Sequence, residues 1–577
     1  MIEKMTRYSF IVYSGDREEF LNTIQEQGVI DIKRSEKAVD EKSVQMFQRI
    51  AAAREDMETI RKGVDAHLIA LRTEEKALED RLEQTIPWGN FEKDKIEALA
   101  DHGINLHFYC VPAKSFKKEW PEEYPLEVVS DTGSHVYFVT AGECDIPAKE
   151  IPMPSANADE LQVMLDAKRN EIDRYAASLE ARKSELPRLE ALVKDTISEL
   201  NVYLAGVTGE DAAEGSICVF EGYAPEADKE RLCAVFDGMD IYYEAHDATL
   251  EDNPPIKLRN SRFAGLFESI TRMYGMPVYD EFDPTPLLAI FFLLFFAMCM
   301  GDAGYGILLV LIGWGISKGK LKIAMFEGLG PIIMVLGVAT FVVGLVLGTF
   351  FGIDLYQATW VPDAMKSFMV RGKVAGYDAQ MVMALGVGVL HICLAMIFKA
   401  VYAVRRNGFA NSLSTCGWTL LIVGGVLVAA AALLKFIPSE SIKWVVIAIG
   451  AISALGIFIF NKPGRNPLLN VGAGLWDTYQ MATGLLGDVL SYIRLYALGL
   501  AGGLLGAAFN TLALMVRGDS PTWQWLPFVL VLLIGHTLNL LMSCLGAFVH
   551  PLRLNFVEFF KNSGYEGKGL RYNPLKK

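Results

Sequence analysis

The sequence predicts a chain of two unlike halves: cytosolic α/β lobes joined by an antiparallel coiled coil, then an all-α polytopic membrane domain of eight helices. The composition changes near residue 285, from charged and mixed to long apolar runs. Two long charged segments before that point have the pattern of paired helices. Several apolar segments after it are long enough to span a bilayer. We therefore expect a cytosolic arm at 1–285 and a membrane domain at 286–577.

The overall composition excludes some classes of function. The chain has 577 residues, of which 52% are hydrophobic, and a formal net charge of −14 at pH 7. An acidic chain is a poor partner for nucleic acid, because the phosphates repel it. The eight cysteines are scattered without a CxxC pair, so neither a metal site nor a disulfide framework is expected. No GxxxxGK[ST] motif occurs, so we expect no P-loop and no cofactor in this chain.

The first half predicts a rod between small α/β lobes. Leu, Ile, Met and Val recur among charged residues at about 41–84 and 157–205, which favours two helices paired as a coiled coil, the second bent at Pro187. Strand-like runs such as YSFIVY, HVYFVTA and ICVFEGYAP flank them. The N-terminus has no apolar signal-peptide core, so this half should stay in the cytosol. Such a rod suits a docking arm, and a dimerisation coil is the alternative.

The second half predicts eight crossings of a membrane. Its first apolar run is interrupted by MGDAGYGIL, whose glycines allow it to turn back as two short helices. The basic segments SKGKLK, KAVYAVRR, NKPGR and the last two lysines then share one side, which the positive-inside rule assigns to the cytoplasm, with the C-terminus. The expected helices are about 286–301, 303–317, 325–351, 380–404, 411–435, 443–461, 479–516 and 525–560.

Arg494 lies in the middle of an apolar run, GDVLSYIRLYALGLAGG. An arginine at the bilayer centre costs about 3 kcal/mol or more on insertion scales, so it needs a compensating role. Polar residues share its helix face, and a second polar stripe on the last helix ends at Arg553. Intramembrane stripes of this kind line a water path or hold an ion partner. The alternative is a structural ion pair of an arginine with Asp488 or Glu558.

The remaining candidates lie on or near these two stripes. We expect the lining of a polar path to include Gln480, Thr483, Asp488, Ser491, Tyr492, Asn539, Ser543, His550, Asn555 and Glu558. His550 could relay protons or serve as a neutral hydrogen-bonding residue. The small residues Gly499, Gly502, Gly503 and Gly506 allow close approach of another helix, either from a partner carrying a carboxylate for Arg494 or from this chain itself.

These motifs resemble the membrane subunit a of rotary V-type ATPases, called subunit I in prokaryotes. The resemblance is carried by SYIRLYALGLAGGLL, GDAGYGILL, FDPTPLLAIFFLLFFAMCMGD, AFVHPLRLNFVEFF and GYEGKGLRYNPL, with EGYAP in a soluble lobe, and it covers nearly the whole chain. It implies that Arg494 and Arg553 match the two stator arginines and that the last two helices face a rotating proteolipid ring. Ions would enter by one half-channel, ride the ring on a carboxylate and leave by the other.

The resemblance also implies partners and a location. The arm would bind peripheral stalks, and the chain would join the central-stalk and catalytic subunits through the complex, in a prokaryotic plasma membrane. The chain itself would be a non-catalytic subunit that couples H⁺ or Na⁺ movement to ATP hydrolysis or synthesis. Three positions depart from the pattern: Gln480 lies near a usual Glu, Ser543 replaces the Glu of vacuolar relatives, and Gly502 replaces their His.

Two other functions stay open at this point. A self-contained secondary transporter with a cytosolic regulatory coiled coil would have an inverted repeat and broken helices at matching positions. Only one glycine break, at 301–306, is evident. A structural membrane anchor for a cytosolic scaffold would not need two intramembrane arginines.

Overall fold

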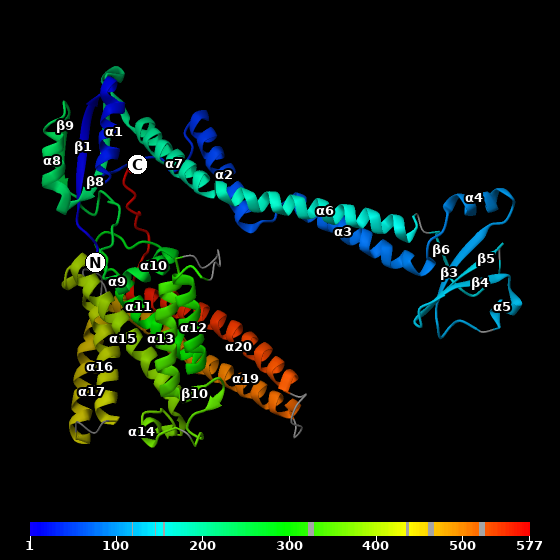
Figure 1. Ribbon diagram of the computed structural model, residues 1–577. Coiled ribbons are helices and arrows are strands. Elements are labelled where there is room, and N and C mark those ends of the chain that lie inside the picture. The colour runs from blue at the N-terminus through cyan, green and yellow to red at the C-terminus, as the bar shows by residue number, and fades with distance from the viewer. Residues whose placement is uncertain are drawn as a thin grey trace. The chain divides into compact units, whose positions relative to one another are not determined.

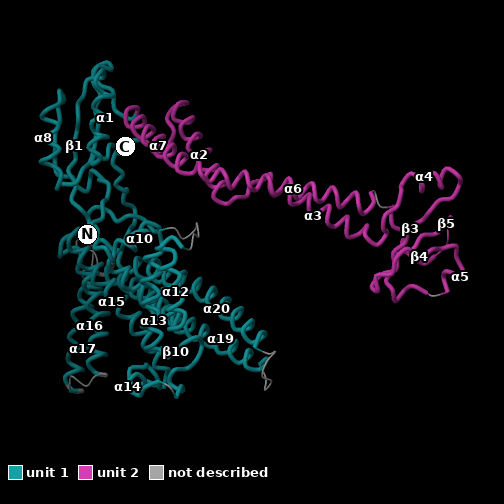
Figure 2. Tube along the Cα trace, in the orientation of Figure 1, with its two compact units in different colours: residues 1–34, 208–576 teal, residues 35–207, 577 magenta. Residues whose placement is uncertain are grey.

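The chain forms two compact units in the computed structural model, residues 1–34 with 208–576 and residues 35–207 with 577 (Figures 1 and 2). The structure describes the chain except for residues 118, 143, 145, 154–155, 321–327, 360, 375, 434–437, 460–466 and 518–524. The basic segment NKPGR and the end of SKGKLK lie outside the described residues.

The first unit begins with an α/β lobe built on an antiparallel sheet. Its strands are β1 (Met5–Tyr13), β2 (Asp31–Ile32), β7 (Glu210–Ala212), β8 (Ile217–Pro225) and β9 (Tyr242–Asp247), in the order β2-β8-β1-β9, with β7 on β8. Alternate β1 residues, Tyr8 and Phe10 among them, are fully buried. They pack with Phe20 of α1 (Arg17–Gln27) and Phe236 of α8 (Lys229–Phe236), so both helices cover the same face of the sheet.

The second unit carries its own small sheet at one end of a long helical pair (Figure 2). The strands β3 (Leu106–Pro112), β4 (Leu126–Asp131), β5 (His135–Ala141) and β6 (Glu150–Ile151) are antiparallel in the order β4-β5-β3-β6. Phe138 and Trp120 lie in its core, and Trp120 begins α5 (Trp120–Glu123). The helix α4 (Lys93–Asp101) precedes β3 in the chain.

The long helices of the second unit pack antiparallel in three apolar clusters. The helices are α2 (Glu41–Lys62), α3 (Ala66–Thr85), α6 (Ala158–Ala181) and α7 (Leu186–Thr208). Ile50 meets Leu200 and Leu204, Leu68 and Leu71 meet Ile172 and Leu179, and Leu82 meets Leu161 and Leu165. Residue numbers that rise along α2 and α3 meet residue numbers that fall along α6 and α7. The chain therefore runs in one direction along α2 and α3 and returns beside them along α6 and α7.

Each of the two long charged segments is interrupted once. Gly63 ends α2 with a φ of 62°, and the Asp65 carboxylate then caps α3 by accepting a hydrogen bond from the Leu68 amide at 2.8 Å. The second break is a 3₁₀ turn, Arg182–Glu185, just before α7. Pro187 is the second residue of α7, where a missing amide donor is harmless, so the bend expected at Pro187 lies in the turn that precedes it.

The C-terminal part of the first unit is helical and apolar. Among the described residues, six helices are long and apolar enough to cross a membrane: Gly330–Leu347, Ala379–Asn407, Ala410–Ala432, Ser441–Ile459, Asn470–Arg517 and Trp525–Ser563. Two shorter apolar helices, α11 (Thr285–Met300) and α12 (Ala303–Ser317), precede them. The division into a mixed α/β region and a helical membrane part is thereby confirmed.

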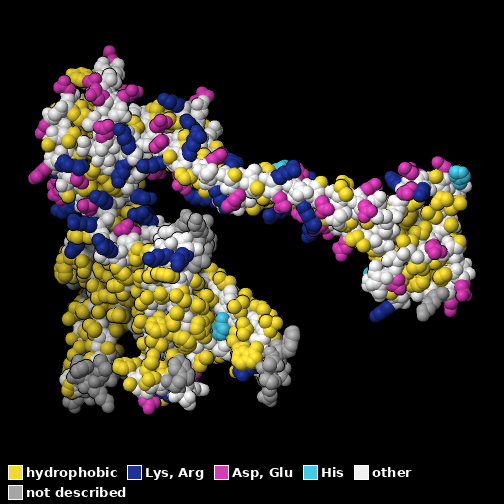
Figure 3. Space-filling model, in the orientation of Figure 1, with side chains coloured by type: hydrophobic (Ala, Val, Ile, Leu, Met, Phe, Trp, Pro, Cys, Tyr) yellow, Lys and Arg dark blue, Asp and Glu magenta, His cyan; other side chains and the backbone are white. Residues whose placement is uncertain are grey.

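The six spans correspond to eight helices of the structure. Four spans are formed by α13 (Gly330–Leu347), α15 (Ala379–Asn407), α16 (Leu413–Leu433) and α17 (Ser439–Ala454). The fifth contains α18 (Pro467–Ser491) and α19 (Ile493–Arg517), and the sixth contains α20 (Trp525–Arg553) and α21 (Phe560–Ser563). Figure 3 shows their yellow apolar surface, with Lys and Arg gathered along its upper border. We call the end of the helices where α15 stops and α21 lies the basic end, since Arg405, Arg406 and Lys561 belong to it.

Asp302 organises the turn between α11 and α12. Gly301 ends α11 with a φ of 60°, and the Asp302 carboxylate caps α12 by accepting from the Gly304 amide at 2.8 Å. The same carboxylate accepts from the amides of Phe351 at 2.8 Å and Gly352 at 2.7 Å. One buried side chain therefore fixes both this turn and the residues that follow α13.

The segment expected as one helix at 479–516 consists of two, α18 and α19, which are separated at Tyr492. The Tyr492 amide bonds to the Val489 carbonyl, three residues back, so the helix tightens there. The Tyr492 ring packs on α15 where a Cβ on Gly388 would lie 2.2 Å from its Cγ. Burial of this ring in the core gives a physical reason for the break, and the glycine makes room for it.

The last helix changes its winding near the basic end. Pro551 lies inside α20, and residues Leu554–Phe559 form a π-helical turn before α21. Proline has no amide hydrogen and displaces the preceding turn, which favours a local change of this kind. Two side-chain amides satisfy backbone carbonyls there: Asn555 donates to the Pro551 carbonyl at 2.8 Å and Asn562 to the Glu558 carbonyl at 2.7 Å.

Candidate functional site

Arg494 has an unpartnered nitrogen within the helical part. It is partly buried on α19, and its Nη1 is buried without a hydrogen-bond partner among the described residues. His550 and Cys299 lie within its electrostatic reach, but neither is an anion partner at neutral pH. Within the described part of the chain, no carboxylate forms an ion pair with Arg494. The guanidinium of Arg494 is therefore a positive charge for which the described residues supply no counter-charge.

Asp488, the first internal candidate to pair with Arg494, is engaged elsewhere. Its Oδ2 accepts a hydrogen bond from the Asn562 side-chain amide at 2.8 Å and lies 3.6 Å from the Lys561 Nζ. Its side chain is 13% exposed. Asp488 therefore ties α18 to α21 at the basic end.

Arg553 and Glu558 form a long, asymmetric ion pair. The Arg553 Nε lies 3.9 Å from the Glu558 Oε1, the arginine side chain is 55% exposed and the glutamate 2%. The second carboxylate oxygen, Oε2, is buried without a partner among the described residues. Arg553 thus remains accessible to another molecule, while Glu558 points into the protein.

A pocket of about 310 Å³ with charged and amide groups in its lining opens at the basic end. It is lined by Ser414, Trp418, Asp477, Gln480, Met481, Gly484, Leu485, Asp488, Lys561 and Asn562. Asp477, Gln480 and Asp488 follow one another down α18 towards Arg494, a rise of about 25 Å from Asp477 to Arg494 at 1.5 Å per residue. The pocket therefore brings together two predicted residues, Gln480 and Asp488, with three charged or amide groups that sequence reasoning did not single out.

A second polar network lies towards the other end of the helices. Asn539 donates to the Gly502 carbonyl at 2.9 Å and to the Tyr305 hydroxyl at 2.8 Å. The Tyr305 hydroxyl lies 2.8 Å from the His536 Nδ1. The network continues from the His536 Nε2 to the Asn510 Oδ1 at 3.0 Å and from Asn510 to the Phe351 carbonyl at 2.7 Å.

The hydrogen bonds of this network can all be satisfied when each donor points towards the next acceptor along the chain of residues from Asn539 to Asn510. If Tyr305 accepts from Asn539, its own hydrogen points to the His536 Nδ1, and the His536 Nε2 then donates to Asn510. Ser543 joins by donating to the Asn539 Oδ1 at 3.3 Å. Of this set the sequence predicted Asn539 and Ser543. His536 lies three residues before Asn539 on the same helix, so helical spacing could have identified it.

Several other predicted residues have local or core roles. Thr483 and Ser491 donate to carbonyls of their own helix, Tyr479 at 2.8 Å and Gly487 at 3.1 Å. Tyr492 is fully buried, and its hydroxyl lies 2.9 Å from the His391 Nδ1 of α15. His550 is partly buried near both arginines, and Asn555 is fully buried.

The glycines after Arg494 are used within the chain. A Cβ on Gly499 would lie 2.7 Å from the Met298 carbonyl of α11, and one on Gly506 would lie 3.1 Å from the Gly352 Cα. A Cβ on Gly502 would meet the Ser543 hydroxyl of α20 at 3.1 Å, whereas Gly503 is more open, with Thr349 at 3.9 Å. These contacts fit the internal-packing alternative, and a ring-facing role of the four residues stays a prediction.

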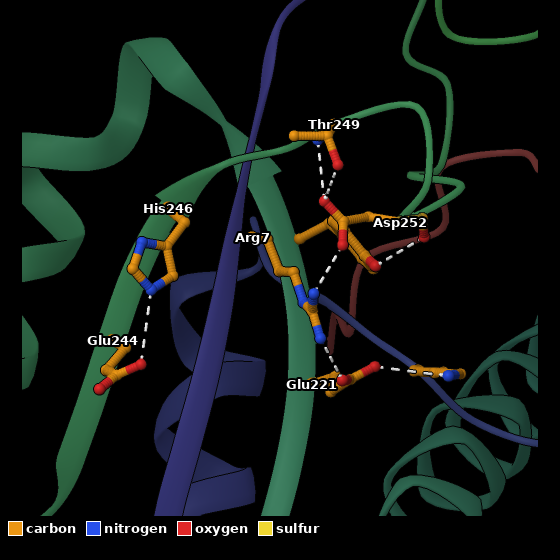
Figure 4. Close-up of polar contacts among 8 residues, drawn as sticks. Arg7, Glu221, Glu244, His246, Thr249 and Asp252 are labelled. Carbon is orange, nitrogen blue, oxygen red and sulfur yellow. Dashed lines mark hydrogen bonds and ion pairs between the residues drawn. The ribbon is translucent and has the colours of Figure 1, made fainter.

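A separate charged cluster lies on the α/β lobe of the first unit (Figure 4). Arg7 on β1 contacts the carboxylates of Glu221 at 2.5 Å and Asp252 at 2.6 Å. Hydrogen bonds from the amide and hydroxyl of Thr249 lower the pKa of Asp252 below its ordinary value. The cluster holds the 248–253 loop on the sheet, and within the described residues no group of three or more His, Cys, Asp or Glu could hold a metal ion.

Known proteins match this chain over most of its length. The model of the V-type ATPase 116kDa subunit family matches residues 137–389 and 481–577. The chain is 26% identical to the V-type ATP synthase subunit I of Borreliella burgdorferi over 623 aligned residues, covering all of both proteins. It is 31% identical to the A-type ATP synthase subunit I of Methanocaldococcus jannaschii over 390 residues, which cover 62% of this chain and 54% of that protein.

The second matched range, 481–577, contains Arg494, Arg553, Asp488 and Glu558, and the first contains the Asp302 turn. The resemblance inferred from the motifs around these residues is thereby confirmed, and the chain belongs to the V-type ATPase 116kDa subunit family.

Proposed function

We propose that this chain is the stator membrane subunit of a rotary V-type ATPase or ATP synthase. It couples the movement of H⁺ or Na⁺ to ATP hydrolysis or synthesis and has no catalytic residue of its own. The observation that carries the proposal is Arg494, a partly buried guanidinium with an unpartnered Nη1 in an apolar helix. Each proteolipid of a rotating ring would bring a carboxylate to it in turn.

The electrostatics of such an encounter produce ion release. A nearby cation lowers the pKa of a carboxylate, so a ring carboxylate that reaches Arg494 is driven to its charged form and gives up its ion. The fixed positive charge also repels cations and prevents direct leakage between the two half-channels. The desolvation cost of the guanidinium is offset while the ion pair lasts.

Two polar regions support two half-channels. The pocket at the basic end, lined by Gln480 and Asp488, provides access from one side. The network of Tyr305, His536 and Asn539 lies nearer the other end of the same helices. We assign the basic end to the cytoplasm. The positive-inside rule places an excess of Lys and Arg on the cytoplasmic side of a membrane protein, and Arg405, Arg406 and Lys561 lie at this end.

The other parts of the chain support the same role. We propose that α11 and α12 also cross the membrane, which with the six longer spans gives eight crossings and places both termini in the cytoplasm. The antiparallel helices of the second unit form a coiled coil that anchors the peripheral stalks. The names of the relatives, subunit I of V-type and A-type ATP synthases, support membership in such a complex.

Purification and transport together test this function. A gently solubilised, tagged chain should co-purify with a proteolipid that has one intramembrane carboxylate and with soluble ATPase subunits. In vesicles, Arg494→Ala should abolish ATP-driven ion uptake, whereas Arg517→Ala, at the end of the same helix, should leave uptake close to that of the native complex. A chain that purifies alone, or uptake that survives Arg494→Ala, contradicts the proposal and favours a self-contained transporter.

A further inference from the structure

His391 is a fully buried histidine that the proposed ion path does not use. It lies near the middle of α15, and its Nδ1 is 2.9 Å from the hydroxyl of Tyr492, which is also fully buried. Its Nε2 is buried without a hydrogen-bond partner among the described residues. A phenylalanine would fill a similar space without leaving a buried polar atom unsatisfied, which is costly. Packing alone therefore does not explain a histidine here, whereas a hydrogen bond to Tyr492 does.

The bond from His391 reaches the break that precedes Arg494. The Tyr492 amide donates to the Val489 carbonyl at 3.2 Å, and the Leu495 amide donates to the Tyr492 carbonyl at 3.1 Å, so both bonds span three residues instead of four. Such bonds wind the chain by about 120° per residue, against about 100° in an α-helix. Regular winding over two residues would therefore turn Arg494 and the rest of α19 by roughly 40° about the helix axis. The tight turn sets the direction in which the Arg494 side chain leaves its helix.

Helix α15 holds the Tyr492 side chain at two points. A Cβ on Gly388 would lie 2.2 Å from the Tyr492 Cγ and 2.7 Å from its Cδ1, so the ring lies directly against the backbone of α15. Gly388 and His391 are three residues apart and share one face of that helix. The glycine makes room for the ring, and the imidazole holds the hydroxyl. Both ends of the Tyr492 side chain are therefore fixed, and with them the tight turn at the start of α19.

The same imidazole contacts the irregular turn that follows Arg553. Its ring stacks on Phe559, with the ring centroids 4.4 Å apart and the ring planes 6° from parallel. Phe559 is fully buried and is the last residue of the π-helical turn Leu554–Phe559. His391 therefore touches both places where the helices that carry the two arginines depart from regular winding.

We propose that His391 is a positioning residue for ion translocation, which acts by holding the tight turn at Tyr492 and thereby the direction of Arg494. This inference rests on the proposed function. The guanidinium must meet each ring carboxylate in one geometry, and a misplacement of about 1 Å can cost about a hundredfold in rate. A misdirected guanidinium would also leave the barrier between the two half-channels incomplete. In this role His391 itself binds no ion.

Ion transport by the whole complex in vesicles tests the positioning role. Gly388→Ala, whose methyl group would displace the Tyr492 ring, should lower ATP-driven uptake by about tenfold or more. Tyr492→Phe and His391→Phe, which keep a ring but remove the hydrogen bond, should each lower uptake by about fivefold. The matched control is Gly386→Ala on the same helix, where an added Cβ meets nothing within 4 Å, and its uptake should stay near the native value.

Two further readouts separate positioning from general damage. The passive ion leak per assembled complex should rise in the variants, because a misdirected Arg494 no longer closes the path between the half-channels. Loss of assembled complex alone would lower uptake and leak together. In a double-mutant cycle, Tyr492→Phe with His391→Phe should lose no more uptake than either single variant, because both remove the same bond. Additive losses without a rise in leak overturn the positioning role.

A distance measurement reports the rotation of α19 directly. Spin labels on unnatural amino acids avoid interference from the eight cysteines of the chain. One label replaces the exposed Leu390 of α15, and the other replaces Leu504 or Leu505 of α19, both exposed and about 100° apart around the helix. A turn of roughly 40° moves a side chain by about 3–4 Å on a helix of about 10–12 Å diameter. Gly388→Ala should therefore change at least one distance and Gly386→Ala neither, and two unchanged distances in Gly388→Ala overturn the proposal.

The two proposals fail in different ways. Uptake that stops with Arg494→Ala but stays near the native value in all three positioning variants overturns the positioning role and leaves the stator function intact. Uptake that persists with Arg494→Ala overturns the stator function itself, whatever the label distances show. If Gly388→Ala does not assemble, the two phenylalanine variants and their cycle decide the positioning role.

Discussion

At the scale of single residues, the two intramembrane arginines differ in their surroundings. Arg494 is partly buried and has no acidic partner in the described chain, whereas Arg553 is 55% exposed and lies beside Glu558. A partly buried, unpartnered charge has most to gain from a counter-charge supplied by another subunit. Arg553 forms a long ion pair with Glu558 and stays accessible to another molecule. The two arginines therefore present one partly buried charge and one exposed charge.

The stability of the first unit should depend on pH through the titration of Asp31. Burial raises the pKa of Asp31 to about 6, against the opposing effects of the Asn573 amide at 2.7 Å and of Arg34. A raised pKa means that the folded state holds the proton more tightly. The stabilisation of the folded state by protonated Asp31 is therefore fully present below about pH 4. It is lost as the pH rises through 6, which lowers the free energy of unfolding by up to about 3 kcal/mol. Thermal unfolding from pH 4 to 7 should show a steeper decline for the native chain than for Asp31→Asn.

At the scale of elements, glycines set how closely the membrane helices pack. A Cβ on Gly306 of α12 would lie 2.4 Å from the Phe341 amide nitrogen of α13, and one on Gly344 would lie 2.2 Å from the Ala303 nitrogen. Backbone atoms cannot move aside as a side chain can, so these positions require glycine. Without a large hydrophobic force between helices in lipid, close contact of this kind is a main source of stability.

Substituting one of these glycines should separate the two helices. Gly306→Ala should lower the free energy of unfolding by about 1–3 kcal/mol, because the methyl group overpacks a backbone contact. The matched control is Gly386→Ala on α15, where an added Cβ meets nothing within 4 Å, so stability should be unchanged or slightly higher. Thermal unfolding in detergent would compare them, and equal midpoints would contradict the packing argument.

At the scale of the whole molecule, the C-terminal tail ties the lobe of the first unit to the helices. After α21, the Gly569 amide donates to the Met276 carbonyl at 2.9 Å. The Leu570 carbonyl accepts from the Ile256 amide at 2.7 Å, and the Tyr572 amide donates to the Ile256 carbonyl at 3.2 Å. The tail then continues to the loop before β2, where the Leu575 amide donates to the Ile30 carbonyl at 3.0 Å and its side chain is fully buried. Residues from the two ends of the chain therefore share one core.

Removing the tail should loosen the lobe without removing the helices from the membrane. A chain ending at Lys568 loses the buried Leu575 and the contact of the Tyr572 hydroxyl with the Val29 carbonyl. We expect faster proteolysis of the 248–260 segment, because its backbone partners on residues 570–572 are gone. Arg571→Ala, at an exposed position of the same tail, should behave like the native chain. Unchanged proteolysis of the shortened chain would show that the tail is not needed to hold the lobe.

The sequence by itself determined the family of the chain and its change from mixed α/β elements to apolar helices. The change of composition near residue 285 is large enough to separate a mixed α/β region from an apolar helical part. The motifs around Arg494 and Arg553 resemble those of the family whose model matches the chain. A charge in an apolar helix indicates in addition that these residues have a function. These conclusions depend on composition and local pattern, which do not change with the packing of the chain.

Only the tertiary structure decided which of the candidate residues meet. Helical spacing places side chains on a face only while the winding is regular, and the tight turn at Tyr492 and the π-helical turn at 554–559 rotate all later residues. Asp488 therefore meets Lys561 instead of Arg494, and Tyr492 is buried against His391. The partners of Asn539, namely Tyr305 and Gly502, come from helices distant in sequence. Contacts of this kind depend on helix packing, which a single helical period does not encode.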